Sequence, residues 1–379
     1  MTDKRFAPWM CCALLTVALS LVPGVTQAGA EDNIEERMID ANAAPIKARL
    51  KGSWVFVPIP VSNPTVGSGL EVAVLYLHPP KPGQQTARGT TSGFGAMATD
   101  SGSKLAGVFH DASLANDRYR LSAFAGLGKF NLQYYGVGAG TAPGGQSIPY
   151  EFSGGAARLR GEARLPGSEH WFAGLTYLYL QTTVTFKTSA VVPGLPNPGR
   201  EVRTAGLGPQ ISFDSRDSNY FPLQGTYFSA RWADYAPRWG GDLSYDKADI
   251  FYNHYQPLAA QTVLALRARL QTASEGTPFY DLPTLDMRGF SRDRYRDKRS
   301  LSLIAELRHK FRPRWGAAAF VEAGRVAASL SAMADARTIT TYGGGVRWQV
   351  TTDRPLHLGL DAAVSSDDSA VFIQVGERF

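Results

Sequence analysis

Residues 299–311, Arg-Ser-Leu-Ser-Leu-Ile-Ala-Glu-Leu-Arg-His-Lys-Phe, alternate between two kinds of side chain over most of their length. The apolar row is Leu301, Leu303, Ala305 and Leu307, and the mostly polar row is Ser302, Ile304, Glu306 and Arg308. Successive side chains of a β-strand point to opposite faces, so this pattern predicts a strand with one apolar and one polar face. Residues 261–273 and 355–365 repeat the arrangement.

The whole chain divides into such strands wherever turn signals interrupt the alternation. We place them at residues 70–78, 90–99, 104–113, 118–127, 130–138, 151–165, 171–187, 204–214, 225–236, 244–256, 261–273, 299–311, 315–326, 338–350, 355–365 and 370–379. A soluble β-sandwich would also alternate, but long strands, a high strand count and polar rows rich in Arg, Glu and Gly favour a hydrated lumen. The sequence therefore predicts an all-β fold, a single 16-stranded antiparallel transmembrane β-barrel.

The connections between these strands alternate in length. Short ones, at residues 100–103, 166–168, 312–314 and 352–354, interleave with long ones near 139–150, 188–203, 275–298 and 327–337. Bacterial barrels have short periplasmic turns and long external loops. We therefore expect the four short connections at the periplasmic end.

The first 30 residues have the layout of a secretory signal peptide. Lys4 and Arg5 precede an apolar run from Trp9 to Val22, and small residues close the segment. The run is too short to span a bilayer as a helix, and the only two cysteines lie within it. We expect residues 1–30 to be a signal peptide, 31–53 a short periplasmic N-terminal segment and 54–379 the barrel.

Motifs of enzymatic and cofactor chemistry are absent from the sequence. It has no Gly-x-Ser-x-Gly, no phosphate-binding loop, no His-Glu-x-x-His and no cysteine pair for zinc. The six histidines have no spacing that would indicate a metal site, and the basic residues lack regularly spaced aromatic partners for nucleic acid. We expect no catalytic, metal or cofactor site and no nucleic-acid partner; a lipid-modifying hydrolase built from a distant Ser and His stays as a minor alternative.

Two motifs carry a family resemblance. Arg288-Gly289-Phe290, in the longest loop, resembles the Arg-Gly-Tyr/Phe loop motif of the bacterial surface-antigen barrels, the superfamily of BamA/TamA assembly barrels and two-partner-secretion translocators. Phe320, Glu322 and Gly324 are similar to its Phe-x-Asp-x-Gly strand motif, with Glu in place of Asp. Residues 57–70 look like the lead-in to its first strand, and five expected strands follow the loop, as in the family.

The resemblance implies an outer-membrane protein that takes part in inserting or translocating protein, or lipid, across the bacterial outer membrane. It implies that the long loop folds inward to the barrel wall. Residues 31–53 are too few for the POTRA domains of large members, so we expect a member that lacks them. The expected partners are outer-membrane lipid and lipopolysaccharide and a protein client or periplasmic partner, and the alternative is a passive pore or structural surface antigen.

Two hypotheses concern particular residues. The first places a weak seam between strands 70–77 and 371–379, because Gly67, Gly69 and Gly376 weaken the strands there, with Phe379 as the terminal signal. The second pairs Arg288 with Glu322. The row opposite Glu322, from Ala317 to Ala323, is wholly apolar, so Glu322 should point into the lumen and need a cation.

Overall fold

The computed structural model describes residues 53–79, 90–139, 147–187, 199–217, 222–349, 357–375 and 377–379. The expected signal peptide and residues 31–52 lie outside this range. Sixteen strands form one sheet in sequence order, each antiparallel to the next. They are β1 (Ser53–Asn63), β2 (Gly67–Leu77), β3 (Thr91–Thr99), β4 (Lys104–Leu114), β5 (Tyr119–Tyr134), β6 (Ile148–Arg164), β7 (Trp171–Phe186), β8 (Glu201–Asp214), β9 (Gly225–Tyr235), β10 (Tyr245–Ala259), β11 (Thr262–Ala273), β12 (Arg299–Arg312), β13 (Trp315–Ala327), β14 (Ile339–Gln349), β15 (His357–Ser365) and β16 (Ser369–Val375).

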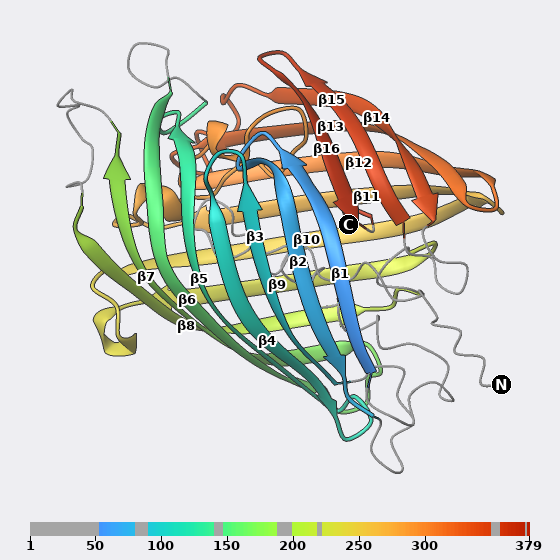
Figure 1. The fold of residues 1–379 in the computed structure, drawn as a ribbon, viewed down its shortest axis with the longest axis horizontal. Helices are drawn as coiled ribbons and strands as arrows, with labels where there is room; N and C mark the ends of the chain where they lie inside the picture. The colour runs from blue at the N-terminus through green and yellow to red at the C-terminus, as the bar shows by residue number, and fades with distance from the viewer. Residues whose placement is uncertain are drawn as a thin grey trace, which may run out of the picture.

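The sheet curls into a barrel whose first and last strands meet. In Figure 1 the blue and green strands form the near wall, the yellow to red strands cross behind and above them, and β1 lies beside β16. No helix within the described residues has the length and hydrophobicity needed to cross a bilayer. The predicted fold class is confirmed.

Burial follows the alternation that predicted the strands. On β12, Leu303 and Leu307 are exposed while Glu306 and Arg308 are buried inside the barrel. On β13, Glu322 is buried and its neighbour Val321 is exposed. The apolar rows thus form the outer surface and the polar rows fill the lumen, as a membrane barrel requires.

The first strand was not predicted as a strand. The prediction placed residues 31–53 in a periplasmic segment and residues 57–70 in a lead-in, but residues 53–63, which include Pro58 and Pro60, form β1 and pair with β2 without a break. Proline is tolerated on an edge strand when its nitrogen faces away from the partner. Because the ladder to β2 is continuous through both prolines, their nitrogens must face the other side, toward β16.

A second error cancelled the first in the strand count. The prediction split residues 118–138 into two strands at Gly128, but Gly128 stays in register with Gly154 and β5 runs unbroken to Tyr134. The turn at 100–103 consequently lies at the opposite end of the barrel from the one expected. Its Asp100 accepts a hydrogen bond from the Ser68 N–H beside the β1–β2 turn, at the end where the long loop also lies.

Candidate functional site in the barrel lumen

Charged side chains from four neighbouring strands converge inside the barrel. The inward rows place Glu306 and Arg308 on β12, Glu322 on β13, Arg347 on β14 and Asp361 on β15, and all five are buried. A charged group on the lipid-facing side of a membrane barrel is costly, which favours the inward rows for these five side chains. The site is therefore a lumenal charge cluster on the wall from β12 to β15.

Arg288, from the loop between β11 and β12, lies at the centre of this cluster. Its Nε donates to Glu322 Oε1 at 2.6 Å, and its Nη1 donates to Glu306 Oε2 at 2.7 Å and to Asp361 Oδ2 at 2.9 Å. Its backbone N–H donates to Glu322 Oε2, and its guanidinium lies 3.2 Å from the centre of the Phe320 ring. The structure thus brings Arg288 and Glu322 together, and it adds two carboxylates that the sequence did not indicate as partners.

The glycines of both motifs make room for this loop. Gly289 has φ +93°, a conformation that favours glycine. At Gly324 an added Cβ would lie 2.7 Å from Met287 Sδ and 2.9 Å from Leu285 Cδ2, so the strand motif leaves space for the loop side chains. Phe290 is buried in an apolar cluster with Leu285, Met287, Tyr295, Val326 and Ile339.

The end of the chain enters the same cluster. Glu377 accepts from Arg347 Nε at 2.9 Å and lies 3.6 Å from Arg308, and both it and Phe379 are buried. Arg308 Nη2 donates to the Phe379 carbonyl, and the Phe379 ring lies near Tyr255. The tail therefore lies inside the lumen after β16 ends, and the role of Phe379 as a terminal signal stays a prediction.

A second group of charges joins the loop to the tail. Asp286 accepts from Arg378 Nη2 at 2.8 Å and from Arg269 Nη1 at 3.2 Å, and Arg269 also binds Asp249. The alternation of residues 261–273 already placed Arg269 in the inward row. Nothing in the sequence indicated that Asp286 and Arg378 would be its neighbours, because they lie on a loop and a tail with no period.

The loop also contacts both turns that flank the seam. Arg292 donates its backbone N–H to Thr65 Oγ1 at 3.1 Å, and Thr65 lies in the β1–β2 turn. Arg294 pairs with Asp368 at 3.0 Å and the Tyr295 hydroxyl donates to Asp367, both in the β15–β16 turn. Residues 291–295, which we call the strap, therefore bridge the two edges of the barrel at this end.

The seam itself lies one strand away from its predicted place. It separates β1 from β16, so Gly67 and Gly69, which lie on β2 opposite Asn63 and Val61, are not at the seam. Gly376 lies outside the described residues. The error follows from the missed first strand. Among the described residues β1 and β16 lie side by side, but no ladder joins them, unlike every pair of strands consecutive in the sheet.

These features define a class: a 16-stranded outer-membrane-type barrel with charged residues of a long loop and of the chain end held inside its lumen. Residues 145–355, more than half of the chain, match the family model of the Omp85 superfamily domain. The chain belongs to the Omp85 superfamily.

Solved structures of low sequence identity share the fold. BamA from Haemophilus ducreyi lacking POTRA domains 1–3 aligns with a TM-score of 0.58 at 14% identity over 86% of this chain and 70% of that chain. CdiB from Escherichia coli aligns with a TM-score of 0.59 and CdiB from Acinetobacter baumannii with 0.55, each at 12% identity over 86% of this chain. The chain spans 62% and 59% of those two CdiB chains, respectively. No functionally curated protein matches the sequence significantly.

Proposed function

We propose that this barrel takes part in inserting or translocating a protein, or a lipid, at the outer membrane, and that it does so by opening between β1 and β16. The observation that carries the proposal is the chemistry of β1. Pro58 and Pro60 leave two positions on its β16 side without an N–H donor, so that edge offers fewer hydrogen bonds than an ordinary strand. Because two N–H donors are missing there, we expect the contact between β1 and β16 to be weaker than the contacts between the other neighbouring strands.

The lumenal cluster and the strap support the same role. Arg288 holds the loop to β12, β13 and β15, while the strap contacts the turns on both sides of the seam. The loop is thus held to the barrel wall through Arg288 and bridges the seam through the strap. Such a loop would stabilise the closed state of the seam. Opening the seam would then require the strap contacts with Thr65, Asp367 and Asp368 to break while the buried cluster persists. Of these contacts the exposed Arg294–Asp368 pair should contribute least.

A passive pore is the competing proposal within the same fold. The lumen of a water-filled channel would leave its charged lining hydrated, yet Arg288, Glu306, Glu322 and Asp361 are buried. Their burial favours a filled lumen on this side of the barrel. Single-channel recording of the reconstituted barrel separates the two, since a passive pore gives a steady open conductance and a filled lumen does not.

An enzymatic role has weaker support. Among the described residues, Ser92 accepts or donates hydrogen bonds at 2.8 Å with both His78 Nε2 and His110 Nδ1, on the outer face near the end opposite the strap. A Ser nucleophile works with a base that a third group orients. Within the part of the chain that the structure describes, no carboxylate contacts either imidazole, and we propose no catalysis there.

Locking the seam tests the proposed function. Cysteines at Phe56 on β1 and Ile373 on β16, joined by a bismaleimide in cells, should abolish complementation of the deletion phenotype. The same reagent on cysteines at Leu159 and Tyr177, which face each other on β6 and β7, should leave complementation intact. Full activity with the β1–β16 pair crosslinked would refute the proposal. The pair expected from the sequence, Val72 with Ile373, is unsuitable because Val72 lies on β2.

A further inference from the structure

The outer surface of the wall from β5 to β8 shows where the membrane ends. Ladder partners on this surface form rows across the strands. The row Ala125, Ala157, Tyr179 and Ala205 is mostly apolar, the next row, Leu127, Gly155, Gln181 and Arg203, is mixed, and the row Lys129, Ser153, Thr183 and Glu201 is polar. From the first of these rows to the third, the surface becomes more polar toward the end of the barrel that carries the long loop. The boundary of the outer leaflet therefore crosses these strands near Gly155.

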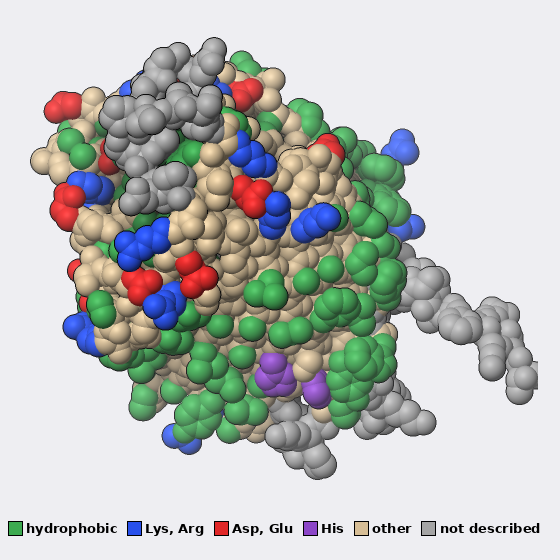
Figure 2. Space-filling view, turned by 60° about the vertical axis from the view of Figure 1, so that its left-hand side comes forward, with side chains coloured by type: hydrophobic (Ala, Val, Ile, Leu, Met, Phe, Trp, Pro, Cys, Tyr) green, Lys and Arg blue, Asp and Glu red, His purple; other side chains and the backbone are tan. Residues whose placement is uncertain are grey.

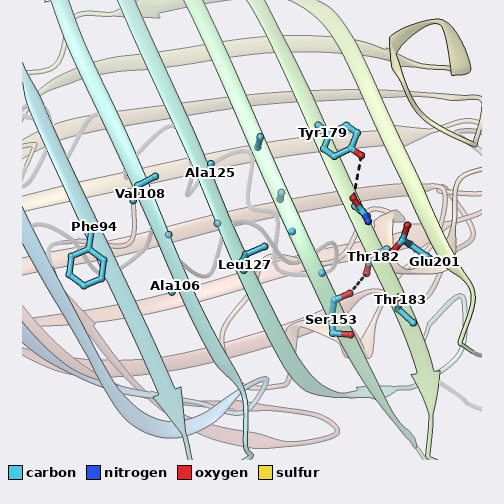
Figure 3. Close-up of a pocket in the computed structure, with 17 residues that line it drawn as sticks. Phe94, Ala106, Val108, Ala125, Leu127, Ser153, Tyr179, Thr182, Thr183 and Glu201 are labelled. Carbon is cyan, nitrogen blue, oxygen red and sulfur yellow. Dashed lines mark hydrogen bonds between the residues drawn. The ribbon is translucent and has the colours of Figure 1, made fainter.

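A hollow of about 740 Å³ lies in the outer surface at this boundary. Its apolar part is lined by Phe94, Val108, Leu127 and several Ala and Gly residues, and its polar part by Ser153, Gln181, Thr183 and Glu201. Figure 3 shows Phe94, Val108 and Leu127 on neighbouring strands, with Tyr179 directed toward Gln181, whose Oε1 accepts its hydroxyl proton at 3.5 Å. The hollow is thus apolar on its membrane side and polar on the other.

Its small residues explain why the surface is recessed here. Gly155 lies between Leu127 and Gln181, and Ala157 lies between Ala125 and Tyr179, so β6 contributes almost no side chain to these two rows. A Cβ at Gly155 would lie 2.8 Å from Leu127 Cδ2, so Leu127 leans over that position. Figure 2 shows the same division on a larger scale, with charged side chains gathered toward the top and left of the view and hydrophobic ones below.

Two lysines lie beside the polar part of the hollow: Lys129 in the polar row itself and Lys187 directly after the end of β7. Lys129 Nζ lies 2.8 Å and Lys187 Nζ 3.8 Å from the same oxygen of Glu151, and the two lysine side chains are 52% and 49% exposed. Two ammonium groups that share one carboxylate leave a net positive charge at the β5–β7 side. Glu201, the carboxylate that lines the hollow, lies on β8 on the other side.

We propose that the hollow binds one phosphorylated glycolipid of the outer leaflet. The acyl chains lie against the apolar floor, because a recess in a membrane wall must be filled by something apolar. The hydroxyl and amide side chains at the boundary suit sugar hydroxyls, and Lys129 and Lys187 suit a phosphate. The inference depends on the membrane placement of the barrel and not on the opening of the seam.

Native mass spectrometry of the refolded, lipid-free barrel in detergent tests the site. The probes are bisphosphorylated lipid A, phosphatidylglycerol and phosphatidylethanolamine, titrated separately. Ala157→Trp, which fills the hollow, should weaken binding of the first lipid A molecule at least about tenfold. Ala163→Trp, on the same outward row of β6 but outside the hollow, should leave it within about twofold.

The lysines test the headgroup assignment. Lys129→Gln and Lys187→Gln should each weaken lipid A binding about fivefold and should leave phosphatidylethanolamine unaffected. Heat-modifiable migration on gels shows that each variant is folded. Equal affinity for all three lipids, a preference for phosphatidylglycerol over lipid A, or an unchanged affinity in Ala157→Trp would overturn the proposal. Failure of the seam crosslink to block function would not bear on it.

Discussion

At the scale of single residues, Arg288 ties the long loop to the lumenal cluster. Three carboxylates, one aromatic ring and its own backbone N–H fix its position. Removing one member of a buried ion pair leaves an uncompensated charge, which typically costs about 3 to 5 kcal/mol. The planar guanidinium is required because it directs separate N–H groups to Glu322, Glu306 and Asp361.

We therefore expect Arg288→Lys to behave as a loss, and Glu322→Asp to be tolerated better than Glu322→Ala. A double-mutant cycle with Arg288→Ala and Glu322→Ala should give a coupling free energy of more than about 1 kcal/mol, because the two groups share hydrogen bonds. Thermal unfolding in detergent and protease sensitivity of the loop provide the measurements. Strict additivity, with no added cleavage of the loop, contradicts the pairing.

The strap should respond to pH through two groups outside the strands. Hydrogen bonds from Tyr295 and Arg337 hold the pKa of the Asp367 carboxyl below its ordinary value of 3.8. Burial and the hydrogen bond to Asp367 raise the pKa of Tyr295 to about 12. The contribution of Asp367 is present above pH 3.8 and is lost as pH falls through its lowered pKa, and that of Tyr295 is present below pH 10 and is lost as pH rises through about 12.

Hydrogen exchange of the strap amides, corrected for intrinsic rates, should show constant protection between about pH 4 and pH 10. Protection should fall outside that window. Asp367→Asn at pH 7 should reproduce the acid-exposed strap. Asp368→Asn should have a smaller effect, because it weakens the partly exposed pair with Arg294 and keeps an oxygen that can accept from the Ser369 N–H. Protection that persists unchanged in Asp367→Asn contradicts this account.

At the scale of elements, period-two alternation predicted the strand type, the facing of each row and the five strands after the loop. The prediction failed at two places where the local sequence does not indicate how a segment pairs with its neighbouring strand. The lead-in predicted at residues 57–70 hid β1, although residues 53–63 pair with β2 throughout, and Gly128 and Lys129 suggested a turn inside β5. Whether residues 53–63 form a strand and whether β5 continues past Gly128 both depend on pairing with the neighbouring strand. Alternation within one segment does not reveal that pairing.

The residues of the lumenal site also fall into those that the sequence predicted and those that it did not. Alternation predicted that Glu322 points inward, and the family motif pointed to Arg288, so the pair could be predicted from the sequence. Glu306 and Asp361 also lay on inward rows, but only the barrel's curvature brings them to one guanidinium. Glu377 and Arg378 follow the last strand, where alternation ends, and their burial depends on the lumen that the other strands enclose.

Replacing the two prolines of β1 should strengthen the seam. Pro58→Val with Pro60→Val should restore two N–H donors toward β16 and stabilise the barrel by about 1 to 3 kcal/mol, at about 0.5 to 1.5 kcal/mol for each net hydrogen bond. Complementation of the deletion phenotype should fall. Pro209→Val, at an interruption of the β8–β9 ladder away from the seam, controls for replacing proline with valine. Equal effects of both changes on stability and complementation would rule out a special role for β1.

At the scale of the whole molecule, the barrel combines a nearly continuous sheet with one joint, between β1 and β16, that we propose to be weak. Fifteen consecutive strand pairs form antiparallel ladders, while the described residues of β1 and β16 form no ladder with each other. The lumenal cluster fixes the loop and the tail to the wall beside this joint, and the strap bridges its two edges at one end. The lipid hollow lies on a different part of the wall, so lipid binding and seam opening should be separable.

The distance across the seam tests the central claim most directly. Spin labels at Phe56 on β1 and Ile373 on β16 of the barrel in lipid nanodiscs, measured by pulsed electron paramagnetic resonance, should give a broad or two-component distance distribution. Labels at Leu159 and Tyr177, on directly paired strands, should give a single narrow one. Pro58→Val with Pro60→Val should narrow the seam distribution toward this control. A seam distribution as narrow as the control in the unmodified barrel would contradict the account.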